Sequence, residues 1–381
     1  MRFGYWLMPC HGPRTNLTLA YEDDLRLAER AEDLGFEEFW IGEHHSGGWE
    51  LIPSPELFIA AAAQRTRRLR FGTGVISLPY HHPFLVAERM AFLDHLTRGR
   101  LVMGVGPGGL PSDVKMFGLG LPALRPMMDE ALDIILRLYR EDGPLTYEGR
   151  YWTLRDVVLQ ITPYQRPHMP LAVASIGTPH SLELAARNGL RVLSAAVAPD
   201  TDPDGLAKQW RFVERNAATA GRVASREDWS IQVVLYVADT TARAVEDIRA
   251  GATRHLADYW YHVGVRAGFE DFAARPGETI DLERVMRTRG WIVGDPDECV
   301  RRVRALQAAS GGFGGIILTV LDWTSPEKWR RSEELFARYV MPELVGSNRG
   351  LAQSWDQLKA DAAAGALPSP YGPPQKRLDE K

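Results

Sequence analysis

Cysteine is scarce in this chain, which has only Cys10 and Cys299 among its 381 residues. Two thiols are too few for a disulfide framework or a thiolate metal cage, and we expect a cytoplasmic protein with reduced thiols. A basic excess is also missing, because 45 Lys and Arg stand against 49 Asp and Glu, for a net charge of −4. This balance argues against a nucleic-acid binder, so we expect no nucleic-acid partner.

Long apolar runs are absent as well. No uninterrupted stretch approaches the roughly 20 residues that a membrane span needs, and the first residues lack the pattern of a signal peptide. We therefore expect no membrane association. Hydrophobic residues nevertheless make up 45% of the chain and charged residues 25%. This composition is typical of a folded globular protein and excludes a disordered one.

Short apolar runs alternate with longer amphipathic ones along most of the chain, which predicts strands followed by helices. The predicted strands are 3–8, 38–41, 69–77, 101–105, 171–174, 191–195, 229–237 and 315–320. The predicted helices are 19–34, 55–67, 84–96, 125–139, 181–188, 206–220, 242–256, 296–309 and 326–340. Eight such units favour parallel pairing in one α/β (β/α)₈ TIM barrel. The competing fold is an open doubly wound sheet in two domains, but no linker-like stretch divides the chain near its middle.

Two insertions enlarge the barrel, which we expect to span residues 1–345. Residues 144–167 break the alternation with scattered β-formers and predict an inserted hairpin or a long loop. Residues 259–289 form a second irregular stretch with several Gly and Pro residues. Residues 346–381 are polar and Pro-rich, which predicts a loose C-terminal tail that is partly disordered or docks on a partner.

Polar residues follow the second and third predicted strands, at the ends that form the active-site face of a barrel. The run 42–45, GEHH, could supply acid/base groups or ligands, or Glu43 could simply pair with an arginine. The run 78–83, LPYHHP, adds two further histidines to the same rim. A zinc hydrolase would use such residues, but adjacent histidines rarely ligate one metal together and the first strand lacks His-x-His. We therefore expect no metal site.

Glycines and hydroxyl residues follow the fourth and fifth predicted strands. The run 104–109, GVGPGG, formally matches G-x-G-x-x-G, but Pro107 removes an amide that a phosphate cradle would use. Its glycines either clear space for a flat ligand or form a tight turn. The run 174–181, ASIGTPHS, suits a phosphate at a helix N-terminus or an ordinary helix cap. Four aromatic residues near strand ends could line an apolar pocket, although core packing is their default use: Trp6, Trp49, Tyr80 and Trp291.

Taken jointly and in order, these segments resemble the luciferase-like flavin-dependent monooxygenases, the bacterial luciferase family. The resemblance covers residues 2–344. It rests on LGFEEFWIGEHHSGGWE, RFGTGVISLPYHHPFLVAERMAFLDHLTRGRLVMGVGPGG, ASIGTPHSLELAARNG and WIVGDPDECVRRV. Within the family, GWELIPSPELFIAAAAQRT and GPGGLPSD are most similar to the limonene-monooxygenase-like subgroup, which acts on apolar, often cyclic substrates such as terpenoids.

The resemblance implies a (β/α)₈ barrel that binds reduced FMN at its C-terminal face. In the family, reduced flavin and O₂ give a flavin 4a-hydroperoxide, which inserts one oxygen atom into the substrate. We therefore expect a two-component monooxygenase with an apolar, cyclic substrate of terpenoid or polyketide type, and a separate flavin reductase as a transient partner. Family members usually form dimers through the helices that flank the second and third strands, so a homodimer is expected.

The resemblance also assigns roles to single residues. His44 matches the catalytic His of the family, which can hold or shuttle a proton near reduced flavin. Gly74 and Val75 match a non-proline cis peptide bond under the flavin ring. His82 matches the His of a His-Pro motif at the flavin rim, and Gly106 matches the position that faces carbon 4a.

The flavin phosphate is implied to lie at Ser175, Thr178 and Ser181. Bacterial luciferase has an arginine for this phosphate in the loop where the present chain has Pro107, so another group must take that place. The stretch 259–289 matches a mobile loop over the site, and such a lid would keep water from a labile intermediate. Two alternatives stay open: a deazaflavin-dependent oxidoreductase of the same superfamily, and a non-catalytic flavin-binding protein.

Overall fold

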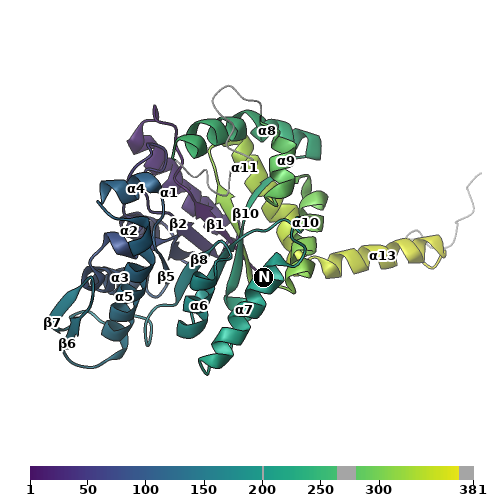
Figure 1. The fold of residues 1–381 in the computed structure, drawn as a ribbon. Helices are drawn as coiled ribbons and strands as arrows, with labels where there is room; N and C mark the ends of the chain where they lie inside the picture. Colours follow the sequence, from purple (N-terminus) through teal and green to yellow (C-terminus); the bar gives the residue numbers. More distant parts are fainter. Residues whose placement is uncertain (200, 264–279, 369–381) are drawn as a thin grey trace, which may run out of the picture.

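Parallel strands close into a barrel that is surrounded by helices in the computed structural model, which describes residues 1–199, 201–263 and 280–368 (Figure 1). The eight barrel strands are β1 (Arg2–Leu7), β2 (Glu38–Ile41), β3 (Arg70–Thr73), β5 (Leu101–Gly106), β8 (Leu171–Ser175), β9 (Arg191–Ala195), β10 (Trp229–Val237) and β12 (Gly315–Val320). Each pairs in parallel with the next, and β12 pairs with β1 to close the ring. The prediction of a (β/α)₈ barrel is confirmed.

Two details of the strands differ from the prediction. The expected strand over 69–77 is interrupted after β3 by a cis peptide bond between Gly74 and Val75, and it resumes as β4 (Ile76–Ser77) beside β5. An additional strand, β11 (Ile292–Gly294), pairs with the carboxyl end of β10. Three residues are too few for an alternating pattern to stand out, so the sequence reading missed β11.

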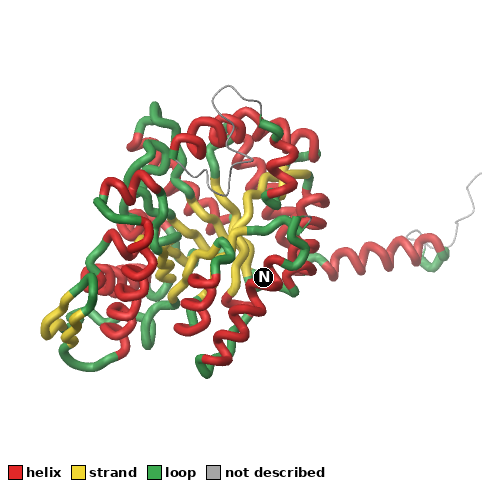
Figure 2. Tube along the Cα trace, viewed as in Figure 1, coloured by secondary structure: helices red, strands yellow, loops and turns green. Residues whose placement is uncertain are grey.

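Helices cover the outside of the barrel (Figure 2). They are α1 (Leu17–Asp33), α2 (Pro55–Arg65), α3 (Pro83–Thr97), α4 (Pro111–Met116), α5 (Leu121–Arg140), α6 (Pro179–Asn188), α7 (Gly205–Thr219), α8 (Thr241–Arg254), α9 (Leu282–Thr288), α10 (Pro296–Ser310), α11 (Pro326–Leu335), α12 (Met341–Val345) and α13 (Arg349–Ala363). The short segments between them include 3₁₀ helices η1 (Leu78–Tyr80) and η2 (Arg226–Asp228), and π-helices η3 (His255–Trp260) and η4 (Phe336–Val340). Among the described residues, no helix is long and apolar enough to cross a membrane.

Local sequence signals position these helices. At α10 the carboxylate of Asp295 accepts a hydrogen bond from the backbone N–H of Glu298, Pro296 takes the first turn, and Gly311 ends the helix with φ +79°. An acceptor before the helix and a glycine after it satisfy backbone groups that have no partner inside the helix. The same arrangement of proline at the start and glycine at the end brackets α6.

The barrel interior is filled by side chains from alternate strand positions. One buried cluster joins residues of six strands: Trp6, Trp40, Val102, Ala172, Leu193 and Ile317. The Trp6 and Trp40 rings stack with centroids 6.5 Å apart. A Cβ at Gly72 would lie 2.1 Å from the Trp40 ring, so glycine is what makes room for this indole. The core is therefore a packed plug beneath the carboxyl-end face and not a pore.

The insertions match the sequence prediction in part. Within residues 144–167, β6 (Leu145–Glu148) and β7 (Thr153–Val157) form the expected hairpin. Most of the lid-like stretch lies outside the described residues, and its flanks are η3 and α9. The tail differs from the expected loose segment, because α13 is a helix that projects from the barrel with no buried residue (Figure 1). Its Ala, Leu, Gln and Lys residues favour a helix, and the prolines that suggested a loose tail come only after it.

Candidate active site

The segments that follow β2, β3 and β5 meet at the carboxyl-end face of the barrel. These strands are neighbours in the sheet, and β4 continues the third strand with Ser77 opposite Gly106. The backbone N–H of Ser77 donates to Glu43 Oε2 over 2.8 Å, which joins the segment after β2 to the segment after β3. The predicted site residues of these segments are thus gathered at one end of the barrel.

His44 lies between two carboxylates. Its Nε2 is 2.9 Å from Oε2 of Glu50, and its Nδ1 is 3.2 Å from Oδ2 of Asp113. An ionised carboxylate only accepts hydrogen bonds, so a ring that meets one at each nitrogen carries a proton on both. Burial alone would lower the pKa of His44, but the two carboxylates outweigh it and raise this pKa to about 10. His44 is therefore a partly buried imidazolium at neutral pH.

Both carboxylates are fixed by further hydrogen bonds. Asp113 Oδ1 accepts from the backbone N–H of His45 over 3.2 Å and from the Ser46 hydroxyl. These partners and His44 lower the pKa of Asp113 although burial alone would raise it. Glu50 Oε1 accepts from the Tyr259 hydroxyl. Neither carboxylate is free to turn away from His44 without losing a partner.

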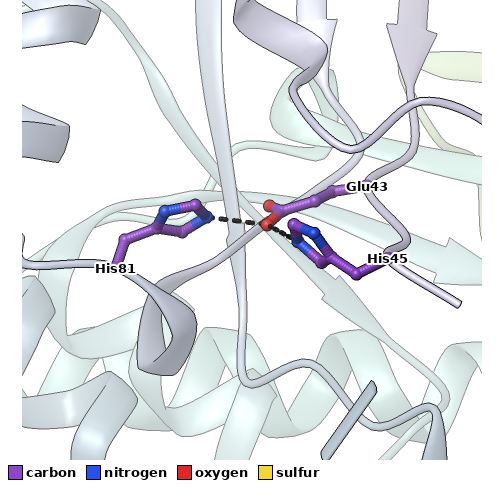
Figure 3. A group of neighbouring side chains, drawn as sticks. All are labelled: Glu43, His45 and His81. Atoms are coloured by element: carbon purple, nitrogen blue, oxygen red, sulfur yellow. Dashed lines mark hydrogen bonds and ion pairs between the residues drawn. The ribbon is translucent and has the colours of Figure 1, made fainter. Parts of the chain in front are cut away.

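A third carboxylate, Glu43, binds two histidines (Figure 3). Nε2 of His45 lies 2.9 Å and Nε2 of His81 lies 2.7 Å from the same oxygen, Oε1. The two rings and the Ser77 N–H lower the pKa of Glu43 against the effect of its burial. Within the part of the chain that the structure describes, Glu43 thus pairs with histidines and not with an arginine.

The donor atoms of Glu43, His45 and His81 all lie within 4.8 Å of one another, which is close enough for them to hold a metal ion. Their hydrogen bonds account for the same arrangement without an ion, because one carboxylate oxygen accepts readily from two N–H donors. The expectation that the site binds no metal stays a prediction.

Gly74, Val75 and Gly106 lie together where β3 and β5 end and β4 begins, and they are called the Gly74, Val75 and Gly106 patch below; both glycines are buried and Val75 is half-buried. A Cβ on Gly106 would lie 2.5 Å from Cγ2 of Val75, and a Cβ on Gly74 would lie 3.3 Å from the Trp6 ring. Glycine at both positions therefore makes room for the Trp6 and Val75 side chains. The cis peptide bond that the resemblance implies is present. Its place beneath a flavin stays a prediction.

Three hydroxyl groups gather at the start of α6. Ser181 Oγ lies 2.8 Å from Ser175 Oγ and 3.0 Å from Thr178 Oγ1. Thr178 precedes the helix, but its side chain makes no capping hydrogen bond, so the ordinary cap is not what this residue forms. The first-turn N–H groups of a helix and nearby hydroxyls suit a phosphate. The cluster is therefore suited to a phosphate group, and its role toward the phosphate of FMN stays a prediction.

The hydroxyl cluster also lies beside Pro107. Val173 of β8 pairs with Val105 of β5, and Ser175 and Pro107 each come two residues later. Ser175 is thus next to the loop in which an arginine is absent. The sequence does not predict which group takes the place of that arginine. In the structure, the hydroxyls of Ser175, Thr178 and Ser181 contact one another.

The four aromatic pocket candidates lie in different surroundings. Trp6 is buried in the barrel plug, whereas Tyr80 stacks on Phe117 at 4.4 Å near His45. Trp49 and Trp291 are linked by ring contacts through His255 and Trp323. Trp291 also lines a cavity of about 100 Å³ with Met8, Trp260 and Trp323. Their role toward a substrate stays a prediction.

Some residues of the candidate site were missed by the sequence reading, and the assignment of His82 to the flavin rim stays a prediction. His82 is exposed at the start of α3, and it is the neighbouring His81 whose ring reaches Glu43. Glu50, Asp113 and Tyr259 were not singled out. Two of them could have been found from the sequence, because they lie in segments that carry the family resemblance. Glu50 ends EHHSGGWE, and Asp113 ends GPGGLPSD.

The closed barrel, the paired histidines after β2 and the glycines after β5 define a luciferase-like barrel. The sequence profile of this family, described as luciferase-like monooxygenase, matches residues 1–312. The chain belongs to this family, and it is an enzyme, a flavin-dependent monooxygenase.

The chain is also similar to individual proteins of known activity or structure. The chain is 43% identical to 4-hydroxyprotoasukamycin monooxygenase of Streptomyces nodosus subsp. asukaensis, over 95% of this chain and 98% of the relative. It is 39% identical to limonene 1,2-monooxygenase of Rhodococcus erythropolis, over 90% of this chain and 87% of the relative. Among solved structures, the oxygenating constituent of 3,6-diketocamphane monooxygenase from Pseudomonas putida, in complex with FMN, matches with a TM-score of 0.76 at 26% identity, over 90% of this chain and 98% of that chain.

Proposed function

We propose that this protein is the oxygenase component of a two-component monooxygenase. It takes reduced FMN from a separate flavin reductase and uses O₂ to oxygenate an apolar, cyclic substrate. The observation that carries the proposal is that the His44 imidazolium and the Gly74, Val75 and Gly106 patch follow neighbouring strands at one end of the barrel. The FMN complex of a structural relative supports the choice of flavin.

The residues present fit FMN. The Gly74, Val75 and Gly106 patch presents little side-chain bulk to a flat ring system, because two of its three residues are glycines. The hydroxyls of Ser175 and Ser181 beside the α6 N-terminus would hold the phosphate. When bound, reduced FMN supplies the electrons that activate O₂ for insertion of one oxygen atom.

The protein's own groups then supply protons and exclude water. His44 holds a proton at each ring nitrogen, so it can stabilise negative charge that develops on oxygen near it. Trp49, Tyr259 and His255 form a ring cluster above the segment after β2, and their apolar surfaces limit the entry of water. Exclusion of water would keep the activated oxygen from being lost to solvent before it reaches the substrate.

The substrate class follows from the aromatic surroundings and from the names of the relatives. Limonene, diketocamphane and protoasukamycin name the substrates of the related enzymes. A cyclic apolar molecule of terpenoid or polyketide type would pack against rings such as Trp49 and Tyr80. The protein would act as a cytoplasmic homodimer, and exposed apolar side chains on α2 and α3, Leu57, Leu85 and Phe92, offer a surface for the second copy.

Anaerobic titration with reduced FMN tests the proposal. We expect binding in the micromolar range or tighter, and O₂ consumption that depends on substrate when a flavin reductase and NADH are present. Absence of both would contradict the proposal. Turnover with a reduced deazaflavin under nitrogen would instead favour a dehydrogenase, and flavin binding that gives no turnover with any limonene-like or polyketide-like compound would favour a flavin-binding protein.

A further inference from the structure

Glu50 connects the His44 ring to π-helix η3. One carboxylate oxygen of Glu50 accepts from His44 and the other accepts from the hydroxyl of Tyr259. Glu50 is buried, with 5% of its surface exposed, and Tyr259 is buried, with 2% exposed. Each oxygen of this carboxylate therefore has one partner, and the two partners come from residues 215 positions apart in the chain.

Packing holds both ends of this connection in place. The backbone at Glu50 forms an isolated antiparallel bridge with Cys10. The Tyr259 ring packs with Leu110 and Val263 in a buried cluster and contacts the Trp49 ring at 5.9 Å. Neither Glu50 nor Tyr259 can change its orientation without disturbing these contacts. The Glu50 carboxylate is thus presented to His44 in one orientation.

The charges around His44 favour its cationic form. Glu50 and Asp113 face the ring directly, and next to Glu50 lie the Tyr259 hydroxyl, the Cys10 thiol and the His255 ring. Burial raises the pKa of Tyr259 and that of Cys10, and burial lowers the pKa of His255 to about 4. These three groups are therefore neutral at pH 7. The His44 ring therefore faces two negative charges, and this negative charge opposes the loss of either ring proton.

We propose that Glu50 and Tyr259 are positioning residues that keep both nitrogens of His44 protonated, so that His44 meets the reaction as a fixed cation and not as a base. Glu50 supplies the negative charge, and Tyr259 fixes the orientation of that charge. The inference rests on the proposed function only in so far as it assigns His44 to the reacting centre. The charge state of His44 in the protein without flavin does not depend on that assignment.

NMR of the imidazole ¹⁵N resonances tests the charge state directly. The His44 signals are assigned by comparison with a His44→Gln variant and followed from pH 6 to 10 in the protein without flavin. We expect both nitrogens to carry protons throughout pH 6–8. In Glu50→Gln we expect proton binding by His44 to weaken at least about tenfold, because one of its two facing charges is gone. In Tyr259→Phe we expect a smaller weakening, since the charge stays but its orientation is no longer fixed.

A matched control removes an acid elsewhere. Glu56→Gln removes a carboxylate on α2 that pairs with Arg89 and should leave the His44 titration unchanged. Circular dichroism of each variant establishes that it is folded. Neutral His44 in the unsubstituted protein at pH 7, or an unchanged titration in folded Glu50→Gln, would overturn the inference.

Turnover separates this inference from the proposed function. With substrate and reductase, kcat of the unsubstituted enzyme should stay nearly flat between pH 6 and 9, whereas kcat of Glu50→Gln should fall by about half or more as pH rises to 9, and KM should change little. A cationic His44 in a protein that oxygenates no substrate would overturn the proposed function and leave the positioning role intact. Oxygenation with an equally flat kcat profile in Glu50→Gln would overturn the positioning role alone.

Discussion

At the scale of single residues, the histidines on the active face differ in what their nitrogens contact. Both nitrogens of His44 meet carboxylates, whereas His45 and His81 each place Nε2 on the one shared oxygen of Glu43. His82 is exposed at the helix start. These histidine rings are therefore not equivalent. Of the four, only His44 is held as a cation between a carboxylate of the segment after β2 and a carboxylate of the segment after β5.

Replacing His44 should remove activity while the fold persists. We expect His44→Gln to lower kcat by about 10²- to 10³-fold, because it removes the positive charge at the site. Binding of reduced FMN should change far less, since the implied flavin contacts lie at other residues. Steady-state oxygenation assays and anaerobic titration measure the two quantities. His95→Gln on α3 is the control, and full activity in His44→Gln would contradict a catalytic role.

The space beside Gly106 is too small for a side chain. Because an added Cβ would lie 2.5 Å from Val75 Cγ2, we expect Gly106→Ala to lower the free energy of unfolding by about 1–3 kcal/mol and to weaken reduced-FMN binding. Urea unfolding and titration give the two values. Adding Val75→Ala removes the colliding methyl group and should restore stability. If Gly106→Ala binds FMN normally, the patch does not face the flavin.

At the scale of elements, strand β2 carries polar groups at both ends of the barrel. Its last residues lead into the His44 segment, and its first residue, Glu38, is buried at the opposite end. Glu38 Oε1 accepts from Arg191 over 2.7 Å and from Arg2 over 3.1 Å, and Oε2 accepts from the Trp40 indole over 3.1 Å. Burial would raise the pKa of Glu38, but these partners, Arg191 first, lower it.

The Glu38 cluster should make stability depend on pH. A carboxyl group whose pKa is lowered in the fold stabilises the protein above the ordinary Glu pKa of about 4.3, and this contribution is lost as pH falls. Glu38→Gln should therefore cost about 3–5 kcal/mol at pH 7, since it leaves buried arginine without its partner, and less at pH 4. Denaturant unfolding at both pH values measures it. Glu37→Gln, on an exposed neighbour, should cost almost nothing at either pH, and equal costs for the two variants would refute the role of the cluster.

The sequence predicted the elements better than it predicted the site. Alternating runs identify the eight strands because parallel barrel strands are buried and short, with helices between them. The break at Gly74 was visible only through family resemblance, since RFGTGVIS reads as one strand by pattern. The pairing of His44 with Asp113 joins residues 69 positions apart. Periodicity carries no information on such a contact, which arises only when the barrel brings β2 and the segment after β5 together.

At the scale of the whole molecule, the barrel and α13 are separate in packing. The barrel has continuous buried clusters, whereas α13 has no buried residue and exposes Leu351, Trp355 and Leu358 on positions four and three residues apart. That spacing places the three on one helix face. An isolated helix of this length is marginal in water, so α13 adds little to the stability of the barrel.

Removing α13 should leave the barrel as stable as before. A chain that ends at Ser347 is expected to keep its Tm within about 2 °C, because no buried contact is lost. Differential scanning calorimetry of both chains at equal concentration measures the difference. A larger fall in Tm, together with a lower mass in sedimentation equilibrium, would mean that α13 packs on a second copy.

The scarcity of cysteine has a practical consequence for labelling. Cys10 and Cys299 are both buried, and burial raises the pKa of each thiol, so neither offers the exposed thiolate that maleimide reagents attack. A cysteine introduced at Leu351 on α13 would be the one reactive thiol in the native protein. A fluorophore attached there would report on contacts that α13 makes, without a label on the barrel itself.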